Sequence, residues 1–110
     1  MQEIKAVIRT ERLQDVVYAL HELPDMPGLM VSTVRGFGRR SPAALGDPVV
    51  YDEILFTKLE TVVDERVVAQ VIDIIVRYAQ TGRAGDGKIF VVPITATVRI
   101  RDGARLGGEA

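Results

Sequence analysis

The order in which strand and helix patterns follow one another most restricts the fold of this 110-residue chain. Polar and apolar residues alternate over residues 2–9, which predicts a strand buried on one face, with Ile4, Ala6 and Ile8 on that face. The same reasoning applies to the rest of the chain. It predicts, in order, a helix that ends at the breakers in residues 23–28, a strand over 29–37, a strand from near Tyr51 to Val63, a helix over 64–80, and one or two short strands over 88–101.

This β-α-β-β-α-β order is that of the ferredoxin-like fold, an α+β arrangement of two split βαβ units. We therefore expect one domain over residues 1–110, with an antiparallel sheet and both helices on one of its faces. The other face would be bare, although it carries apolar residues such as Val7 and Val34. Burial of that face against sister subunits predicts an oligomer.

The two helices have recognisable beginnings and inner faces. Thr10 and Asp64 are expected to cap their N-termini, because short polar side chains accept hydrogen bonds from the first free amides. Apolar residues then recur at helical spacing. In the first helix they are Leu13, Val16, Val17 and Leu20, and in the second Val67, Val71, Ile74, Ile75 and Tyr78.

Composition excludes several classes of function. The formal charge is −1 and the chain has no cysteine, so we expect no disulfide, no thiolate chemistry and no general attraction to nucleic acid. A sequence-specific RNA-binding protein should also offer exposed aromatic residues for stacking on bases, and the chain has only six aromatic residues. No apolar run approaches the roughly 20 residues that span a bilayer. We therefore expect a soluble cytoplasmic protein that does not insert into membranes.

The stretch "TGRAGDGKIF", residues 81–90, contains most of a P-loop pattern, but Ile89 stands where a P-loop has Ser or Thr. The surrounding order is also reversed. A P-loop follows a strand and opens a helix, whereas this motif follows a helix and opens a strand. The sequence therefore argues against a P-loop.

Two interpretations of the motif remain open. One is a helix C-cap at Gly82 followed by an ordinary Asp-Gly turn. The other is an anion-binding nest, in which Gly82, Gly85 and Gly87 allow positive φ and a close approach to a ligand. Two further segments favour an anion: "RGFGRR" at 35–40, and "VRIR" at 98–101, which would place Arg99 and Arg101 on one face of a strand. Together these segments indicate a polyphosphate ligand.

With these motifs the chain resembles the PII signal-transduction family from end to end. The matching stretches are "RGFGR" at 35–39, "AQTGRAGDGKIFV" at 79–91 and "VRIR" at 98–101. The resemblance implies a homotrimer with ATP or ADP, and possible binding of AMP, in each cleft between subunits. It also implies a mobile loop over residues 38–53, the T-loop, which docks on a target protein such as a membrane transporter or a metabolic enzyme.

The resemblance also implies the residues that hold the nucleotide. Residues 81–88 would form the phosphate loop, and Arg99 and Arg101 would close on the phosphates from the last strand, before a frayed tail at 102–110. Residues of the second strand would lie along the nucleotide, and others would meet the base or ribose. The full expected set is Ile8, Gly36, Phe37, Gly38, Arg39, Arg40, Glu60, Val62, Thr81, Gly82, Arg83, Gly85, Asp86, Gly87, Lys88, Arg99 and Arg101.

Two positions depart from the family pattern. Arg40 stands where the family commonly has a Gln that helps to bind magnesium and 2-oxoglutarate, and Phe56 stands where it has a Lys that contacts 2-oxoglutarate. The sequence therefore weakens the expectation that magnesium or 2-oxoglutarate binds. Tyr51 lies about two residues beyond the loop tyrosine that some members modify, so its modification is not expected.

The preferred hypothesis is a regulator without enzymatic activity, whose loop responds to an adenine nucleotide. A slow nucleotide hydrolase on the same cleft is the first alternative, and it would need a residue to position water. A structural trimer that has lost its ligand is the second. The intact "GDGK" and "RIR" segments argue against that alternative.

Overall fold

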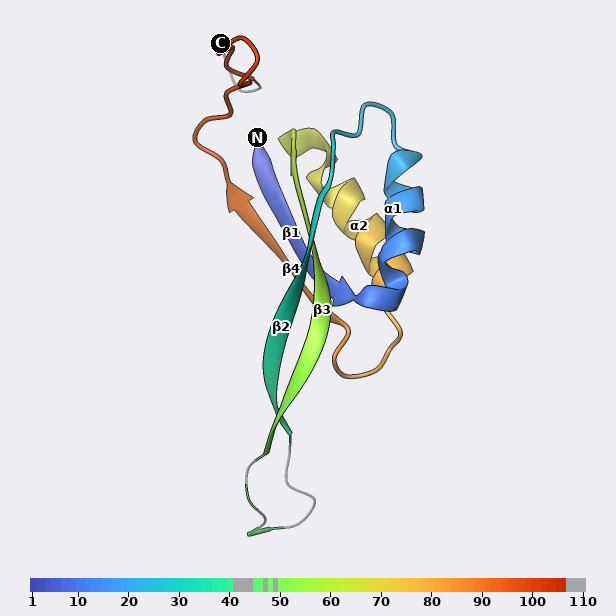
Figure 1. Ribbon diagram of the computed structural model, residues 1–110. Coiled ribbons are helices and arrows are strands. Elements are labelled where there is room, and N and C mark those ends of the chain that lie inside the picture. Colours follow the sequence, from blue (N-terminus) through green and yellow to red (C-terminus); the bar gives the residue numbers. More distant parts are fainter. Residues whose placement is uncertain (41–44, 47, 49, 107–110) are drawn as a thin grey trace.

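The computed structural model describes residues 1–40, 45, 46, 48 and 50–106, with backbone alone for residues 39, 40 and 50. The predicted β-α-β-β-α-β order is confirmed (Figure 1). The elements are β1 (Gln2–Arg9), the 3₁₀ turn η1 (Thr10–Arg12), α1 (Leu13–His21), β2 (Met30–Arg40), β3 (Val50–Val63), the 3₁₀ turn η2 (Glu65–Val67), α2 (Val68–Ala79) and β4 (Gly87–Pro93).

The four strands form one antiparallel sheet in the order β2-β3-β1-β4. Both helices cover the same face of this sheet (Figure 1), as the ferredoxin-like prediction requires. The opposite face carries no helix. β2 and β4 are the two edges, and β3 and β1 separate them.

The core lies between the sheet and the two helices. Ile4, Ala6 and Ile8 of β1 are at most 2 % exposed, which confirms the alternation read from the sequence. They pack with Val16 and Leu20 of α1, Leu59 and Val63 of β3, and Val71, Ile75 and Ala79 of α2. Tyr78 was predicted to face inward but is 38 % exposed, because Ala79 takes the inner position on the last turn of α2.

The two helices begin differently. Asp64 is a cap as predicted, because its Oδ1 accepts a hydrogen bond from the N–H of Arg66 at 2.9 Å. Thr10 is not a cap: it lies inside the 3₁₀ turn η1. Its hydroxyl instead accepts a 3.0 Å hydrogen bond from the buried hydroxyl of Thr57 in β3, which satisfies a polar group in the core.

The ribbon formed by β2 and β3 extends beyond the helices (Figure 1). Its ladder continues through Gly38↔Asp52 to Arg40↔Val50, so the loop is shorter than the predicted 38–53. The sequence missed these pairs because main-chain hydrogen bonds need no apolar periodicity. Residues 41–44, 47 and 49 lie outside the described residues.

The prediction of one or two short strands over residues 88–101 is wrong beyond Pro93, where β4 ends. Residues 97–106 form a separate hairpin instead, with a bridge between Val98 and Arg105 and a turn at 100–102. Arg99 and Arg101 therefore do not project from one strand face. The β1–β4 ladder ends at the pair Gln2↔Pro93, where β1 begins, so the segment after Pro93 has no continuing partner in β1 and closes on itself (Figure 1). This hairpin includes residues 102–106 of the predicted tail; residues 107–110 lie outside the described part.

Candidate functional site

The loop between α2 and β4 has the glycine geometry that the sequence predicted. Gly82, Gly85 and Gly87 have φ values of 83°, 90° and 105°. These values lie in the left-handed region, where side chains other than hydrogen are disfavoured. The loop leaves the helix at Gln80 and enters the sheet at Gly87, whose strand pairs with β1.

The Asp86 carboxylate organises this loop. It accepts hydrogen bonds from the N–H groups of Thr81 and Gly82, at 2.8 and 2.9 Å, and from the Thr81 hydroxyl. Arg9 adds an ion pair from the end of β1, with its Nε 2.8 Å from Oδ1. These donors, with Arg9 first among them, hold the pKa of Asp86 well below its usual range. Asp86 was expected to line a phosphate cleft, but its carboxylate faces the interior of its own loop.

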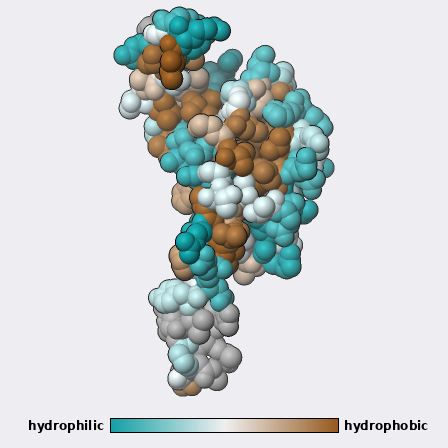
Figure 2. Space-filling view, in the orientation of Figure 1, coloured by the Kyte–Doolittle hydropathy of each residue, from teal (hydrophilic) through white to brown (hydrophobic). Residues whose placement is uncertain are grey.

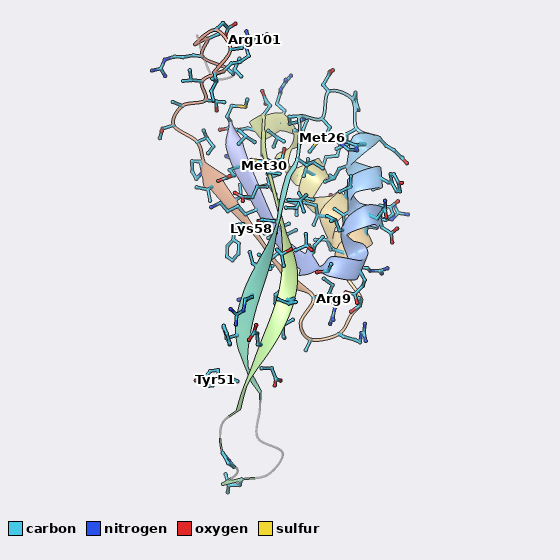
Figure 3. All side chains as sticks on the ribbon, viewed as in Figure 1. Arg9, Met26, Met30, Tyr51, Lys58 and Arg101 are labelled. Atoms are coloured by element: carbon cyan, nitrogen blue, oxygen red, sulfur yellow. The ribbon has the colours of Figure 1, made fainter. Side chains whose placement is uncertain are left out.

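Arg9 was not predicted from the sequence as a site residue. Besides the Asp86 carboxylate, its guanidinium reaches the carbonyl oxygen of Ala84 through Nη2 at 2.8 Å. Figure 3 shows Arg9 beside the loop that follows α2. These contacts join residues 75 and 77 positions apart, so no local motif could have indicated them.

The low pKa of Asp86 predicts an acid-dependent contribution to stability. A carboxyl whose pKa falls on folding stabilises the protein fully above its unfolded pKa, about 3.9, and this stabilisation is lost as pH falls further. We expect Asp86→Asn to unfold more readily than the parent at pH 7, with the difference shrinking below about pH 4. Urea unfolding at pH 7, 5 and 3 tests this, and a difference that does not shrink in acid contradicts it.

The hydrogen bonds of the loop do not use the amides of Ala84 and Gly85. Thr81 and Gly82 donate to Asp86, and the N–H of Arg83 donates to the Thr81 hydroxyl at 3.2 Å. In the part of the chain that the structure describes, the N–H groups of Ala84 and Gly85 have no protein acceptor. Successive free amides beside a glycine with positive φ form the kind of concavity that binds anions.

The bare face of the sheet carries the other candidate residues. Strand register aligns Lys58, Val7 and Lys88 in one row across β3, β1 and β4, and a second row contains Met30 and Glu60. Val62 lies on the same face. Glu60 pairs with Lys58 at 3.5 Å, whereas Lys88 has no ion pair among the described residues. Figure 2 shows apolar and polar side chains interleaved over the side of the molecule in view.

The register also corrects one expected contact. Ile8 is 2 % exposed and points into the core, so its side chain cannot share a ligand with Glu60 and Val62 on the opposite face. Val7 occupies the corresponding position on their face. Strand alternation alone could have found Val7, and Met30 emerges only from the pairing of β2 with β3.

The predicted residues of β2 lie on the ribbon, with two strands, β3 and β1, between them and β4. Gly36 is packed against Phe56, whose Cε2 would lie 3.0 Å from an added Cβ. Phe37 is 65 % exposed with Arg35 over its ring, and Gly38 is exposed. Arg39 and Arg40 form the end of the strand. Tyr51, opposite Arg39, is exposed on β3 (Figure 3).

The C-terminal arginines do not reach the loop of their own chain. Arg99 forms a two-point ion pair with Asp102, at 3.1 and 2.6 Å. Arg101 lies at the top of the molecule in Figure 3, far above Arg9. One chain therefore brings together Thr81, Gly82, Arg83, Gly85, Asp86, Gly87 and Lys88, with Glu60 and Val62 farther along the open face. It does not bring Arg99 and Arg101 to them.

Fold and loop together define a ferredoxin-like α+β protein with a preorganised glycine loop at the edge of an uncovered sheet face. The family model for nitrogen regulatory protein P-II matches residues 1–104. The chain belongs to this family. Among relatives named nitrogen regulatory protein P-II, those from Rhodospirillum rubrum and Azospirillum brasilense are 41 % and 40 % identical to it, over 100 % of this chain and 99 % of theirs. P-II 1 of Escherichia coli K12 is 40 % identical over 94 % of both chains.

Membership of this family gives the protein a regulatory role in signal transduction, and such a role implies contact with target proteins. It is also consistent with a protein that is not an enzyme. None of the helices in the described residues combines the length and the apolar character needed to cross a membrane.

Proposed function

We propose that the protein is a cytoplasmic homotrimeric regulator that binds ATP or ADP between subunits and controls a target protein through the loop joining β2 and β3. The observation that carries this proposal is the Asp86-centred loop. Among the described residues, the N–H groups of Ala84 and Gly85 in this loop have no protein acceptor, and Lys88, at the start of the strand that follows, has no ion pair. Main-chain amides and a lysine are suitable donors for phosphate oxygens.

The arrangement of cationic residues supports a site shared by two chains. The arginines at 99 and 101 are too far from the loop of their own chain, but a neighbouring chain would supply them to it. The exposed apolar residues support the same assembly: Phe90 is 50 % and Ile100 98 % exposed. The radius of gyration is 17.1 Å, against about 13 Å for a compact chain of this length, because the ribbon and the C-terminal hairpin project from the body.

Different residues of the proposed site would contact different parts of the nucleotide. Gly85, Gly87 and Lys88 would meet the phosphates with Arg99 and Arg101 of the adjacent chain, while Val7, Glu60 and Val62 would lie toward the base and ribose. Gly36 to Arg40 would approach from the ribbon. A nucleotide regulates the target if it prefers one conformation of the loop, and a tenfold change in target affinity requires about 1.4 kcal/mol of coupling.

Titration calorimetry with ATP, ADP, AMP and 2-oxoglutarate tests this proposal. We expect ATP and ADP to bind with three sites per trimer, and the trimer to be visible by light scattering. Absence of adenine-nucleotide binding would contradict the proposal and favour a structural trimer. Multiple turnovers of ATP per site, measured as released phosphate, would favour the nucleotide hydrolase instead.

The Arg99–Asp102 ion pair leads to a second expected result. Asp102 accepts hydrogen bonds from Nε and Nη2 of Arg99, one of the two edges through which a guanidinium binds a phosphate, so Asp102 and a phosphate compete for that edge. We expect Asp102→Asn to raise the affinity for ATP about threefold, since exposed ion pairs contribute up to about 1 kcal/mol. Asp73→Asn, an equal charge change on the exposed face of α2, should leave the affinity unchanged. Equal affinities of all three proteins would exclude competition by Asp102.

A further inference from the structure

We infer that Arg9 is a positioning residue for the phosphate loop: by holding the Ala84 carbonyl it fixes the peptide that carries the Gly85 amide, and it neutralises the Asp86 carboxylate. This inference rests on the proposed nucleotide site. Arg9 is the last residue of β1 and contacts the loop after α2. It is not among the residues that are proposed to contact the nucleotide.

The contacts of Arg9 are specific and partly shielded from water. Its side chain is 21 % exposed and that of Asp86 23 %. Its Nε lies 2.8 Å from the Asp86 carboxylate and its Nη2 lies 2.8 Å from the carbonyl oxygen of Ala84. Two acceptors on either side of Gly85 are therefore held by one planar guanidinium.

These contacts determine which loop amides remain available. Asp86 draws the N–H groups of Thr81 and Gly82 inward, while Arg9 draws the Ala84 carbonyl toward β1. In a planar trans peptide the N–H of Gly85 points opposite to the Ala84 carbonyl, so this N–H is turned away from Arg9. Neither it nor the N–H of Ala84 has a protein acceptor among the described residues. Arg9 thus sets the direction in which the loop presents its donors.

The charge of Arg9 has a separate effect. An unpaired carboxylate at Asp86 would repel a polyphosphate, and the repulsion would increase with the number of phosphate charges. Pairing with Arg9 removes most of it. If Arg9 had a purely structural role, its loss would weaken the binding of neutral and charged ligands equally. If its charge matters, the loss of affinity should increase with the number of phosphates on the ligand.

An arginine is needed for both contacts. The guanidinium offers N–H donors in a planar fork and can meet two acceptors at once, whereas a lysine ammonium is a single compact charge. Arg9→Lys should keep the neutralisation of Asp86 and lose the hold on Ala84. This makes it a partial rescue of Arg9→Gln.

The experiment compares the parent protein with Arg9→Gln, Arg9→Lys and Arg66→Gln. Arg66 is a matched control, because it also pairs with an aspartate, Asp64, but its side chain is 86 % exposed and lies at the other end of α2. Affinities for ATP, ADP and adenosine are measured by calorimetry, and hydrogen exchange of the Thr81 and Gly82 amides by NMR.

For Arg9→Gln we expect about tenfold weaker ATP binding, a smaller loss for ADP, and adenosine affinity within twofold of the parent. Arg9→Lys should be intermediate and Arg66→Gln unchanged. Thr81 and Gly82 should exchange faster only in the Arg9 variants. ATP affinity within twofold of the parent in Arg9→Gln, or an equal loss for adenosine and ATP, would overturn the inference.

Failure of the proposed function gives a different result from failure of this inference. If the parent protein binds no nucleotide, the function is wrong and hydrogen exchange alone decides the role of Arg9. Faster exchange at Thr81 and Gly82 in Arg9→Gln would still support the positioning of the loop. Exchange equal to that of the parent would overturn it.

Discussion

Replacing Gly87 with alanine is expected to lower the free energy of unfolding by about 4 kcal/mol, the largest effect that we expect for a glycine among the described residues. Gly87 has φ 105°, and an added Cβ would lie 2.8 Å from the carbonyl carbon of Val7 and overlap its oxygen. Val7 belongs to the central strand β1, so the backbone cannot yield without breaking the β1–β4 ladder. Urea unfolding of the parent and the variant measures the change.

Gly103→Ala is the matched control for this prediction. Gly103 also has a positive φ, 71°, but nothing lies within 4 Å of the added Cβ. It should therefore show only the conformational cost of the left-handed region, about 1 kcal/mol. Similar losses for the two variants would mean that close approach to Val7 is unimportant, and the account of Gly87 would be wrong.

Replacing Lys88 with alanine is expected to weaken ATP binding about 30-fold, since a hydrogen bond from a charged donor to phosphate contributes about 2 kcal/mol. Lys88 is exposed on the bare sheet face next to the loop and makes no ion pair among the described residues, so its removal should leave stability unchanged. Calorimetry with ATP and thermal unfolding of the same sample measure both quantities.

Arg77→Ala controls for the loss of one positive charge. Arg77 lies on α2, on the helical side of the sheet, with its guanidinium 5.6 Å from the Tyr78 ring. Its removal should change ATP affinity less than twofold. Unchanged ATP binding in Lys88→Ala would remove Lys88 from the site, and an equal loss in Arg77→Ala would point to a general charge effect.

Much of the fold could be predicted because it depends on local patterns. Alternation in β1 put Ile4, Ala6 and Ile8 in the core, and helical spacing identified Val16, Leu20, Val71 and Ile75. The Asp64 cap and the positive φ of the loop glycines are also local properties of the backbone. Predictions at the ends of elements were weaker. The ribbon extends to Arg40 and the chain after Pro93 turns into a hairpin, because pairing partners decide where a strand stops.

The site was predicted only in part. The loop at 81–88 was found from its glycines, but the inward direction of the Asp86 carboxylate was not. The resemblance suggested Ile8, while the alternation of β1 had already placed that residue in the core. Burial decides in favour of the alternation and leaves Val7, in place of Ile8, on the bare face with Glu60 and Val62.

By itself the sequence determined the order of elements, their buried faces and the position of a glycine loop, since each follows from steric and hydrophobic preferences of residues close together in the chain. Only the tertiary structure decided that Arg9 would meet Asp86 across 77 residues, and that Lys58, Val7 and Lys88 would share a row. Hydrogen bonds and ion pairs depend on distances of about 3 Å between groups, and strand register sets those distances only after the sheet has formed.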